Sequence, residues 1–185
     1  MKRGYKETEI GEIPEEWDIA KLNEIATPIK EVVGDREIQP MSISAGIGFV
    51  AQSEKWGKEI AGKQYEKYIV LRAGQFAYNK GNSKQFPQGC VYLYNGKNPV
   101  SVPNVFISFT LDKTRCDNGF YQQMFLNNSH GIELVKYINS GTRNNGLLNL
   151  TPNNFYSICL VVPPLPEQKK IAEVLSSVDE SIRAT

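Results

Sequence analysis

The sequence predicts an α+β fold in which a mixed or antiparallel β-sheet is flanked by helices and followed by a projecting helix. Between residues 38 and 102, short runs of β-branched and aromatic residues alternate with glycine, asparagine and proline, which is typical of a sheet with irregular loops. After Asn118 the apolar residues recur at helical spacing. No internal repeat interrupts this order, so we expect one domain over residues 1–162 and a proline-rich junction with a helix over residues 163–185.

The N-terminal half holds one weak pattern and then several clear strand candidates. Residues 15–26 are compatible with an edge strand or a helix, and we favour a helix from about Lys21. An Asn95-Gly96 pair tolerates positive φ and indicates a turn. The expected strands are Gln39–Ile43, Tyr68–Leu71, Phe76–Asn79, Cys90–Tyr94 and Val105–Thr110.

The C-terminal half is predicted to contain two helices and a last strand. The first helix begins at about Asn118 and breaks near Asn127-Asn128. The second covers Ile132–Ile138 and is closed by Gly141, with His130 expected near its start. An apolar run then predicts a strand at Tyr156–Val162, which leads directly into the prolines.

The proline-rich junction predicts where the last helix starts. Pro163 and Pro164 hold the chain extended, and Pro166 suits the first turn of a helix, where a missing N–H costs no hydrogen bond. Four apolar residues follow at spacings of four, three and four, which predicts a narrow seam for a partner helix. They are Ile171, Leu175, Val178 and Ile182. The segment has only about two and a half heptads, which is marginal for a coiled coil.

Composition and charge limit the class of protein to which this chain can belong. The 185 residues are 41% hydrophobic and 22% charged, as expected for one folded domain. The net charge is only +1, but residues 53–97 hold eight basic residues against three acidic ones, whereas residues 1–29 carry a net charge of minus three. A basic middle is typical of a polyanion-binding face, but on the charge pattern alone we favour a solvated lysine-rich surface.

Several functions lack their sequence signals. No apolar stretch approaches the length of a membrane span and no signal segment is present at the start, so we expect a cytoplasmic protein. Cys90, Cys116 and Cys159 lie far apart with a single histidine, so we expect reduced thiols, no disulfide and no metal site. No pattern of catalytic residues is present either, and we expect a chain without catalytic activity.

The first candidate contact loop follows the strand predicted at Phe76–Asn79. Lysines neutralise phosphates, and an asparagine amide can bond two adjacent polar atoms of adenine in the major groove. A polar loop is also the ordinary connection between strands, so both interpretations stay open. The candidate DNA contacts are Tyr78, Asn79, Lys80, Asn82, Ser83 and Lys84.

Two further loops carry candidate contacts. The second loop contains Thr142, Arg143, Asn144 and Asn145, and an arginine can bond guanine or a phosphate through two N–H groups. A helix C-cap followed by a turn would explain the glycine and asparagines, but not the arginine. The third region, residues 42–58, contains Ser44, Lys55 and Lys58. Its Gly46-Ile47-Gly48 segment lacks the remaining features of a nucleotide-binding loop.

A family resemblance covers nearly the whole chain. The string Pro-Pro-Leu-Pro-Glu-Gln-x-x-Ile-Ala at residues 163–172 resembles the junction between a DNA target recognition domain and a spacer helix in specificity subunits of type I restriction-modification systems. Four further pieces resemble the family in the same order. They are residues 10–17 with Leu22, residues 68–80, residues 89–91 with 100–101, and residues 141–144 before Leu150-Thr151. The usual subunit has two recognition domains and two long spacer helices, so this chain resembles a half-length or truncated form.

The resemblance implies a function and a set of partners. Residues 1–162 would be a target recognition domain that reads double-stranded DNA, and residues 163–185 the start of the spacer helix. In the same resemblance, residues 42–58 form a variable strand and loop of the recognition face, which makes Ser44, Lys55 and Lys58 candidate DNA contacts. The implied partners are a methyltransferase subunit using S-adenosylmethionine and a restriction translocase using ATP and Mg, with no cofactor bound by this chain. A second copy, or another specificity chain, would read the other half of a split target.

Two rival interpretations remain. A protein-interaction or decoy module could dock a methyltransferase subunit without reading DNA, and the near-neutral net charge favours it. The chain could also be the recognition region of a single-chain restriction enzyme. Steep loss of affinity with salt is expected only where the chain contacts phosphates, so salt dependence separates DNA recognition from the protein-interaction module.

Overall fold

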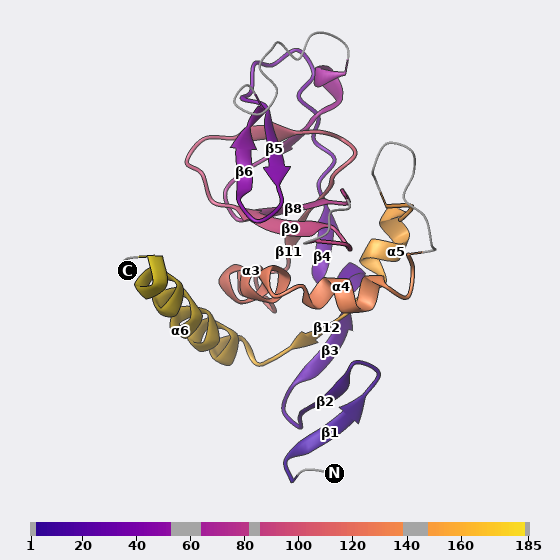
Figure 1. The fold of residues 1–185 in the computed structure, drawn as a ribbon, viewed down its shortest axis with the longest axis vertical. Coiled ribbons are helices and arrows are strands. Elements are labelled where there is room, and N and C mark those ends of the chain that lie inside the picture. The colour runs from indigo at the N-terminus through magenta and orange to yellow at the C-terminus, as the bar shows by residue number, and fades with distance from the viewer. Residues whose placement is uncertain (1–2, 53–63, 82–85, 139–147, 184–185) are drawn as a thin grey trace. The chain divides into compact units, whose positions relative to one another are not determined.

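The computed structural model describes residues 3–52, 64–81, 86–138 and 148–183, and the side chains of residues 180, 182 and 183 lie outside the described set. The chain forms two compact units (Figure 1). Unit 1 comprises Met1–Ala26, Leu111–Tyr137 and Thr151–Thr185, and unit 2 comprises Thr27–Thr110 and Ile138–Leu150. Both units contain antiparallel strand pairs, and unit 1 holds the longer helices, so the predicted α+β class is confirmed. The predicted boundary at residue 162 stays a prediction.

Unit 1 begins with two strands that the sequence did not reveal and a third, β3, in the segment where an edge strand was the alternative to the favoured helix. Strands β1 (Tyr5–Thr8) and β2 (Gly11–Pro14) form an antiparallel hairpin. Strand β3 (Asp18–Lys21) pairs antiparallel with β12 (Cys159–Val162). The helix predicted from Lys21 is the single turn α1 (Leu22–Ile25), whose first N–H donates to the carbonyl of Ile158 at 2.9 Å.

The two predicted helices of unit 1 are present and separated where expected. Helix α3 (Asn118–Leu126) is capped by Asp117, whose carboxylate accepts from the N–H of Phe120 at 2.9 Å. Asn128 then adopts the left-handed conformation, with φ of 59°, before α4 (Ser129–Leu134). Helix α4 stops short of the predicted Ile138. His130 lies at its second position, as expected, and is buried.

The last predicted strand starts too early. Helix α5 (Pro152–Tyr156) occupies its first residue, and β12 begins only at Cys159. The signal for α5 was local, because the Thr151 hydroxyl accepts from the N–H of Asn154 at 3.2 Å and Pro152 opens the helix. Helix α6 (Leu165–Arg183) follows the prolines one residue earlier than predicted and runs beside α3 (Figure 1).

Unit 2 is built on a four-stranded sheet with two smaller strand pairs. The sheet order is β4 (Ala26–Pro28), β11 (Ile107–Leu111), β8 (Gln75–Asn79) and β9 (Cys90–Tyr94). Strand β10 (Val100–Val102) pairs with β7 (Ile69–Leu71), and β5 (Met41–Ser44) forms a hairpin with β6 (Gly48–Ala51). A single 3-10 turn, η1, covers Tyr65–Lys67.

The core of unit 2 explains which strands were predicted well. Phe76 and Phe109 are fully buried and stack with ring centroids 5.3 Å apart. The strand predicted at Cys90–Tyr94 has the observed bounds. The strand predicted at Tyr68–Leu71 starts one residue too early, and the strand predicted at Phe76–Asn79 starts one residue too late. The strands predicted at Gln39–Ile43 and Val105–Thr110 are shifted toward the C-terminus. All three cysteines are buried and free, with Cys90 and Cys159 in strands as expected.

An exposed ion-pair network in unit 2 occupies one of the basic residues counted in the sequence. The Glu31 carboxylate accepts from Arg36 at 2.7 Å and from Arg72 at 2.5 and 3.0 Å. These hydrogen bonds, from Arg72 first and then Arg36, lower the pKa of Glu31 from 4.5 to about 2. Arg72 is therefore engaged within the protein.

The depressed pKa of Glu31 predicts a small dependence of stability on acid pH. Because the folded-state pKa lies below the unfolded value, the network stabilises the protein fully above pH 4.5 and loses this contribution as the pH falls to about 2. The side chains are well exposed, so Glu31→Gln is expected to cost only about 0.5 kcal/mol at neutral pH. Urea unfolding at pH 7 and near pH 2 measures this, with Glu66→Gln as an exposed control. An equal cost at both pH values would contradict the assignment.

Candidate functional site

The described ends of the three predicted contact loops meet in unit 2. Asn79, at the end of β8, donates from its amide to the carbonyl of Ile43 at 3.1 Å and accepts from the N–H of Gly81 at 2.9 Å. The carbonyl of Lys80 accepts from the N–H of Leu148 at 2.9 Å. Ser44 follows Ile43 at the end of β5. We call the group of Ser44, Asn79, Lys80, Gly81 and Leu148 the loop junction.

A hairpin is fixed next to the loop junction by a tyrosine. The N–H of Gly46 donates to the hydroxyl of Tyr92 at 2.9 Å, and burial raises the pKa of this phenol. Gly46 and Gly48 have φ values of 81° and 104°, which the tight turn between β5 and β6 requires. Between them Ile47 is 75% exposed at the tip. The sequence analysis proposed neither Tyr92 nor Ile47 as a site residue, although the two glycines around Ile47 indicate a tight turn.

Tyr78 lies in the core, which differs from the predicted DNA contact. Its side chain is fully buried, and its hydroxyl donates to the carbonyl of Gln88 at 2.7 Å. Burial raises the pKa of this phenol strongly, so it stays protonated. Phe76, Ala77 and Tyr78 are all buried in succession, because both faces of β8 are covered. Tyr78 is therefore a core residue directly before the loop junction, and its hydroxyl is used within the protein.

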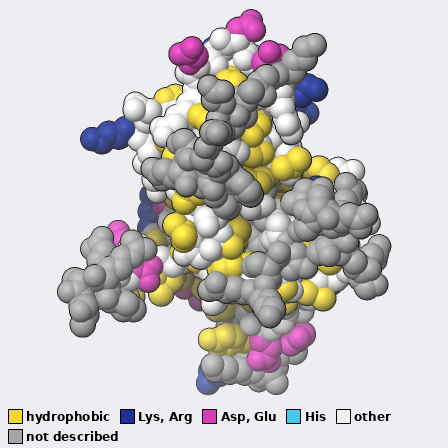
Figure 2. Space-filling model, turned by 45° about the horizontal axis from the view of Figure 1, so that its top comes forward, with side chains coloured by type: hydrophobic (Ala, Val, Ile, Leu, Met, Phe, Trp, Pro, Cys, Tyr) yellow, Lys and Arg dark blue, Asp and Glu magenta, His cyan; other side chains and the backbone are white. Residues whose placement is uncertain are grey.

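The other predicted contacts divide between described and undescribed residues. Asn79, Lys80 and Ser44 are described and half-buried at the loop junction. On the face shown in Figure 2, the described lysine and arginine side chains lie scattered rather than gathered in one patch. The remaining predicted contacts lie outside the described residues: Lys55, Lys58, Asn82, Ser83, Lys84, Thr142, Arg143, Asn144 and Asn145.

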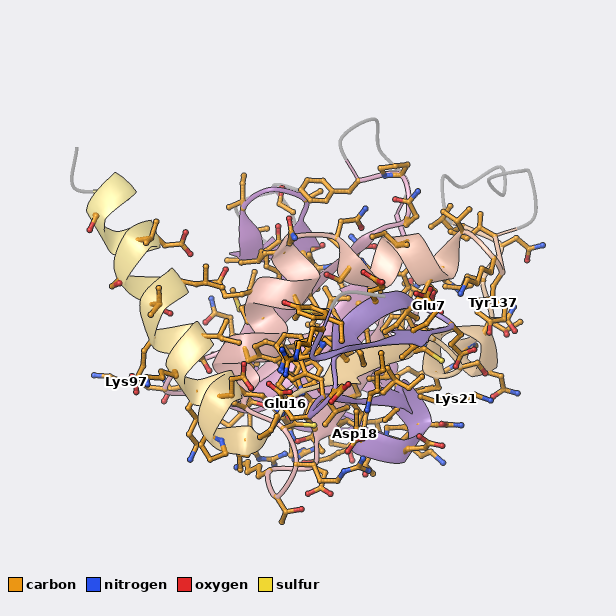
Figure 3. All side chains as sticks on the ribbon, turned by 90° about the horizontal axis from the view of Figure 1, so that it is seen from below. Glu7, Glu16, Asp18, Lys21, Lys97 and Tyr137 are labelled. Atoms are coloured by element: carbon orange, nitrogen blue, oxygen red, sulfur yellow. The ribbon has the colours of Figure 1, made fainter. Side chains whose placement is uncertain are left out.

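The acidic N-terminal part of the sequence lies in unit 1. Three acidic residues of this part are exposed (Figure 3): Glu7 in β1, Glu16 just before β3, and Asp18 at the start of β3. Of these, Asp18 has a cation near it, since Lys6 lies at 3.8 Å from its carboxylate. Exposed carboxylates repel a phosphate backbone. This acidic surface is therefore electrostatically unfavourable for a polyanion.

The predicted seam on α6 is partly covered and partly exposed. Ile171 and Leu175 line a groove of about 580 Å³ between α6 and α3, together with Trp17, Phe120, Met124 and Leu126. Leu175 and Val178 are 40% and 49% exposed, and the side chain of Ile182 lies outside the described residues. The first seam residue thus packs within unit 1, whereas the next two retain apolar surface that a further helix can cover.

The described residues contain no candidate metal site and no candidate membrane-spanning helix. Within the described ranges, no three histidine, cysteine, aspartate or glutamate residues are grouped so that they could hold a metal ion. No helix in the same ranges is both long and apolar enough to cross a membrane.

Comparisons with known proteins identify the family. Residues 14–185 match the domain family described as the type I restriction modification DNA specificity domain. A putative type I restriction enzyme MjaX specificity subunit from Methanocaldococcus jannaschii is 26% identical over 196 aligned residues, which cover 98% of this chain and 44% of that protein. This chain therefore spans less than half the length of that curated relative.

Solved structures share the fold at low sequence identity. The HsdS subunit from Thermoanaerobacter tengcongensis matches with a TM-score of 0.64 and 15% identity, over 93% of this chain and 44% of that one. A chain from a structure of a type I R-M system, described by its complex assembly and conformational transition, gives 0.66 and 14% over the same shares. The type I restriction-modification S subunit from M. genitalium gives 0.54 and 14%, over 91% and 40%.

The class of protein follows from the family match, which covers most of the chain. The chain belongs to the type I restriction modification DNA specificity domain family, which confirms the resemblance seen in the sequence.

Proposed function

We propose that this chain reads one half of a split double-stranded DNA target through the loop junction of unit 2. The observation that carries the proposal is the convergence of three polar loops, far apart in sequence, at the end of β8. Asn79 and Lys80 supply the two chemistries that a DNA site needs, since amides bond base edges and ammonium groups neutralise phosphates. Arg143 and its neighbours belong to the loop that ends at Leu148 and are proposed contacts as well.

The proposed complex has further members. The chain directs a methyltransferase subunit, which uses S-adenosylmethionine, and a restriction translocase, which uses ATP and Mg, to the target in the cytoplasm. The apolar seam of α6 pairs with a second copy of this chain or with another specificity chain, which reads the other half of the target. Two identical copies related by a two-fold axis would select an interrupted palindrome.

Selection from a randomised duplex pool tests this proposal. The chain, with and without a cognate methyltransferase subunit, is incubated with the pool at low and physiological salt. We expect enrichment of a half-site or of an interrupted palindrome. In the same assay, Lys80→Gln is expected to weaken binding and to lower the slope of log affinity against log salt by about 1. Lys113→Gln, an exposed change in unit 1, serves as the control and leaves the slope unchanged.

The rival proposal is a module that docks a methyltransferase subunit without reading DNA. The near-neutral net charge and the exposed apolar surface of α6 favour it. Under this proposal, no sequence is enriched at any salt concentration, even with the methyltransferase present, while the chain still binds that subunit.

A further inference from the structure

One glutamine is fully buried where α6 leaves the body of unit 1. The side chain of Gln168 has no exposed area. Its Oε1 accepts from the N–H of Asp117 at 2.8 Å, and its Nε2 donates to the carbonyls of Arg115 and Pro163, also at 2.8 Å. A buried amide is costly unless its polar atoms are bonded, and here both amide hydrogens and the oxygen are used.

The partners of Gln168 show what this bonding achieves. Arg115 and Asp117 lie just before α3, whereas Pro163 directly follows β12. One amide therefore ties the first turn of α6 to the start of α3 and to the chain entering α6. All three partner groups are backbone atoms, so the bonds constrain the position of the helix rather than the conformation of a flexible side chain.

Other contacts along α6 support the same placement but are individually weaker constraints. The indole N–H of Trp17 donates to Glu167 at 3.0 Å, and the amide of Gln123 donates to Asp179 at 3.0 Å. The helices also approach closely, because a Cβ added to Gly119 would lie 3.2 Å from the Cβ of Ala172. These contacts hold side chains that can rotate, whereas Gln168 joins three backbone groups at the root of the helix.

We infer that Gln168 is a positioning residue that sets the direction of α6 and, in the paired complex, the separation of the two half-sites. This second step rests on the proposed function. Helix α6 has 19 residues and is therefore about 28 Å long, so a tilt of about 10° at its root moves its far end by about 5 Å. That displacement exceeds the rise of one base pair, about 3.4 Å. The helix direction must accordingly be held tightly if the spacing of half-sites is to be read.

The variant Gln168→Met tests this positioning role, because methionine has a similar volume and forms none of the three hydrogen bonds. The matched control is Lys169→Met, which places the same side chain at the next, exposed position of α6. Gln168→Glu is a second variant of nearly identical shape. Its carboxylate can accept from Asp117 but cannot donate to the carbonyls of Arg115 and Pro163. Circular dichroism and thermal unfolding of the full chain establish that each variant is folded.

The first measurement needs no DNA. Spin labels are placed on the full chain at Lys113→Cys and Ser176→Cys, both exposed, while the three native cysteines are buried. Ser176 lies about 16 Å along α6 from Leu165, so a tilt of about 10° changes its position by about 3 Å. We expect the distance distribution to widen by at least this amount in Gln168→Met and Gln168→Glu. Lys169→Met should keep the parent distribution.

The second measurement uses duplexes that carry the selected half-sites with spacers of different lengths. The parent chain and Lys169→Met should prefer one spacer length, whereas Gln168→Met should also accept spacers about one base pair shorter or longer, since each base pair changes the separation by about 3.4 Å. The half-site sequence itself should not change. Unchanged distances and an unchanged spacer preference in folded Gln168→Met would overturn the inference. If the parent chain selects no sequence, the proposed function fails, and the label distances alone decide whether Gln168 holds the helix.

Discussion

Replacing Gly89 with alanine is expected to lower the free energy of unfolding by about 3 kcal/mol or more. Gly89 precedes β9 and has a φ of 77°, a conformation that costs an alanine about 1–2 kcal/mol. An added Cβ would lie only 2.4 Å from the backbone oxygen of Asn79 and 2.7 Å from the ring of Tyr78. Because β8 and Tyr78 are held in the core, neither neighbour can move without disturbing the sheet.

A second glycine of unit 2 separates the clash from the conformational cost. Gly34 also has a positive φ, of 59°, but an added Cβ there would meet no atom within 4 Å. Gly34→Ala is therefore expected to cost only about 1 kcal/mol. Urea unfolding of both variants measures the difference, and equal losses would show that close packing at Gly89 contributes nothing. Since Gly89 lies beside Asn79, its variant should also lose DNA selectivity.

The fold was predictable where the signal was local. Cys90–Tyr94 is an unbroken apolar and aromatic run bounded by Gly89 and by the Asn95-Gly96 pair, and its strand has the predicted bounds. Strand β1 was missed because its Tyr-Lys-Glu-Thr sequence is largely polar, and the pairing with β2 that makes it a strand is not visible in the residues themselves. Helix α5 had a local cap at Thr151, but the apolar run after it dominated the reading.

The candidate site was predictable only as separate loops. Polarity and glycine content identified the segment after β8 and the segment before Leu148 as separate loops. The hydrogen bond between Lys80 and Leu148 brings the two segments together, and a contact between residues so far apart in the sequence is not visible in the residues themselves. Tyr78 was predicted as a contact because it directly precedes the polar loop. Its burial could not be predicted from strand alternation, since both faces of β8 are buried. Gln168 was part of the junction string that carries the family resemblance, but nothing in the sequence indicated its burial, since a glutamine in an amphipathic helix is ordinarily expected on the solvated side.

Removing the amide of Asn79 is expected to weaken binding to the selected DNA sequence by about tenfold to a hundredfold, as the loss of one or two base contacts would. In the structure the amide has an internal role, because it joins the carbonyl of Ile43 to the N–H of Gly81. Asn79→Ala leaves both groups without this partner, with an expected loss of stability of about 1–3 kcal/mol. The end of β5 and the turn after Lys80 then lose their common support.

The DNA measurement distinguishes support of the loops from a general loss of affinity. Binding of Asn79→Ala to the selected duplex and to an unrelated duplex is compared at one salt concentration. The unrelated duplex should lose little, because phosphate contacts by lysines do not require the loops in register. The control is Asn95→Ala, a change at an exposed residue of the same unit, and it should change neither affinity.

A third variant separates the internal role of Asn79 from a direct base contact. Asn79→Asp can still accept from the N–H of Gly81, but it cannot donate to the carbonyl of Ile43 and adds a negative charge where DNA is proposed to lie. If the amide acts mainly as a base contact, Asn79→Ala should relax the selected sequence at one base pair and leave the others unchanged. If it acts by joining the loops, selectivity should fall at several base pairs together. Retention of the parent sequence and affinity in Asn79→Ala would remove the loop junction as the recognition site.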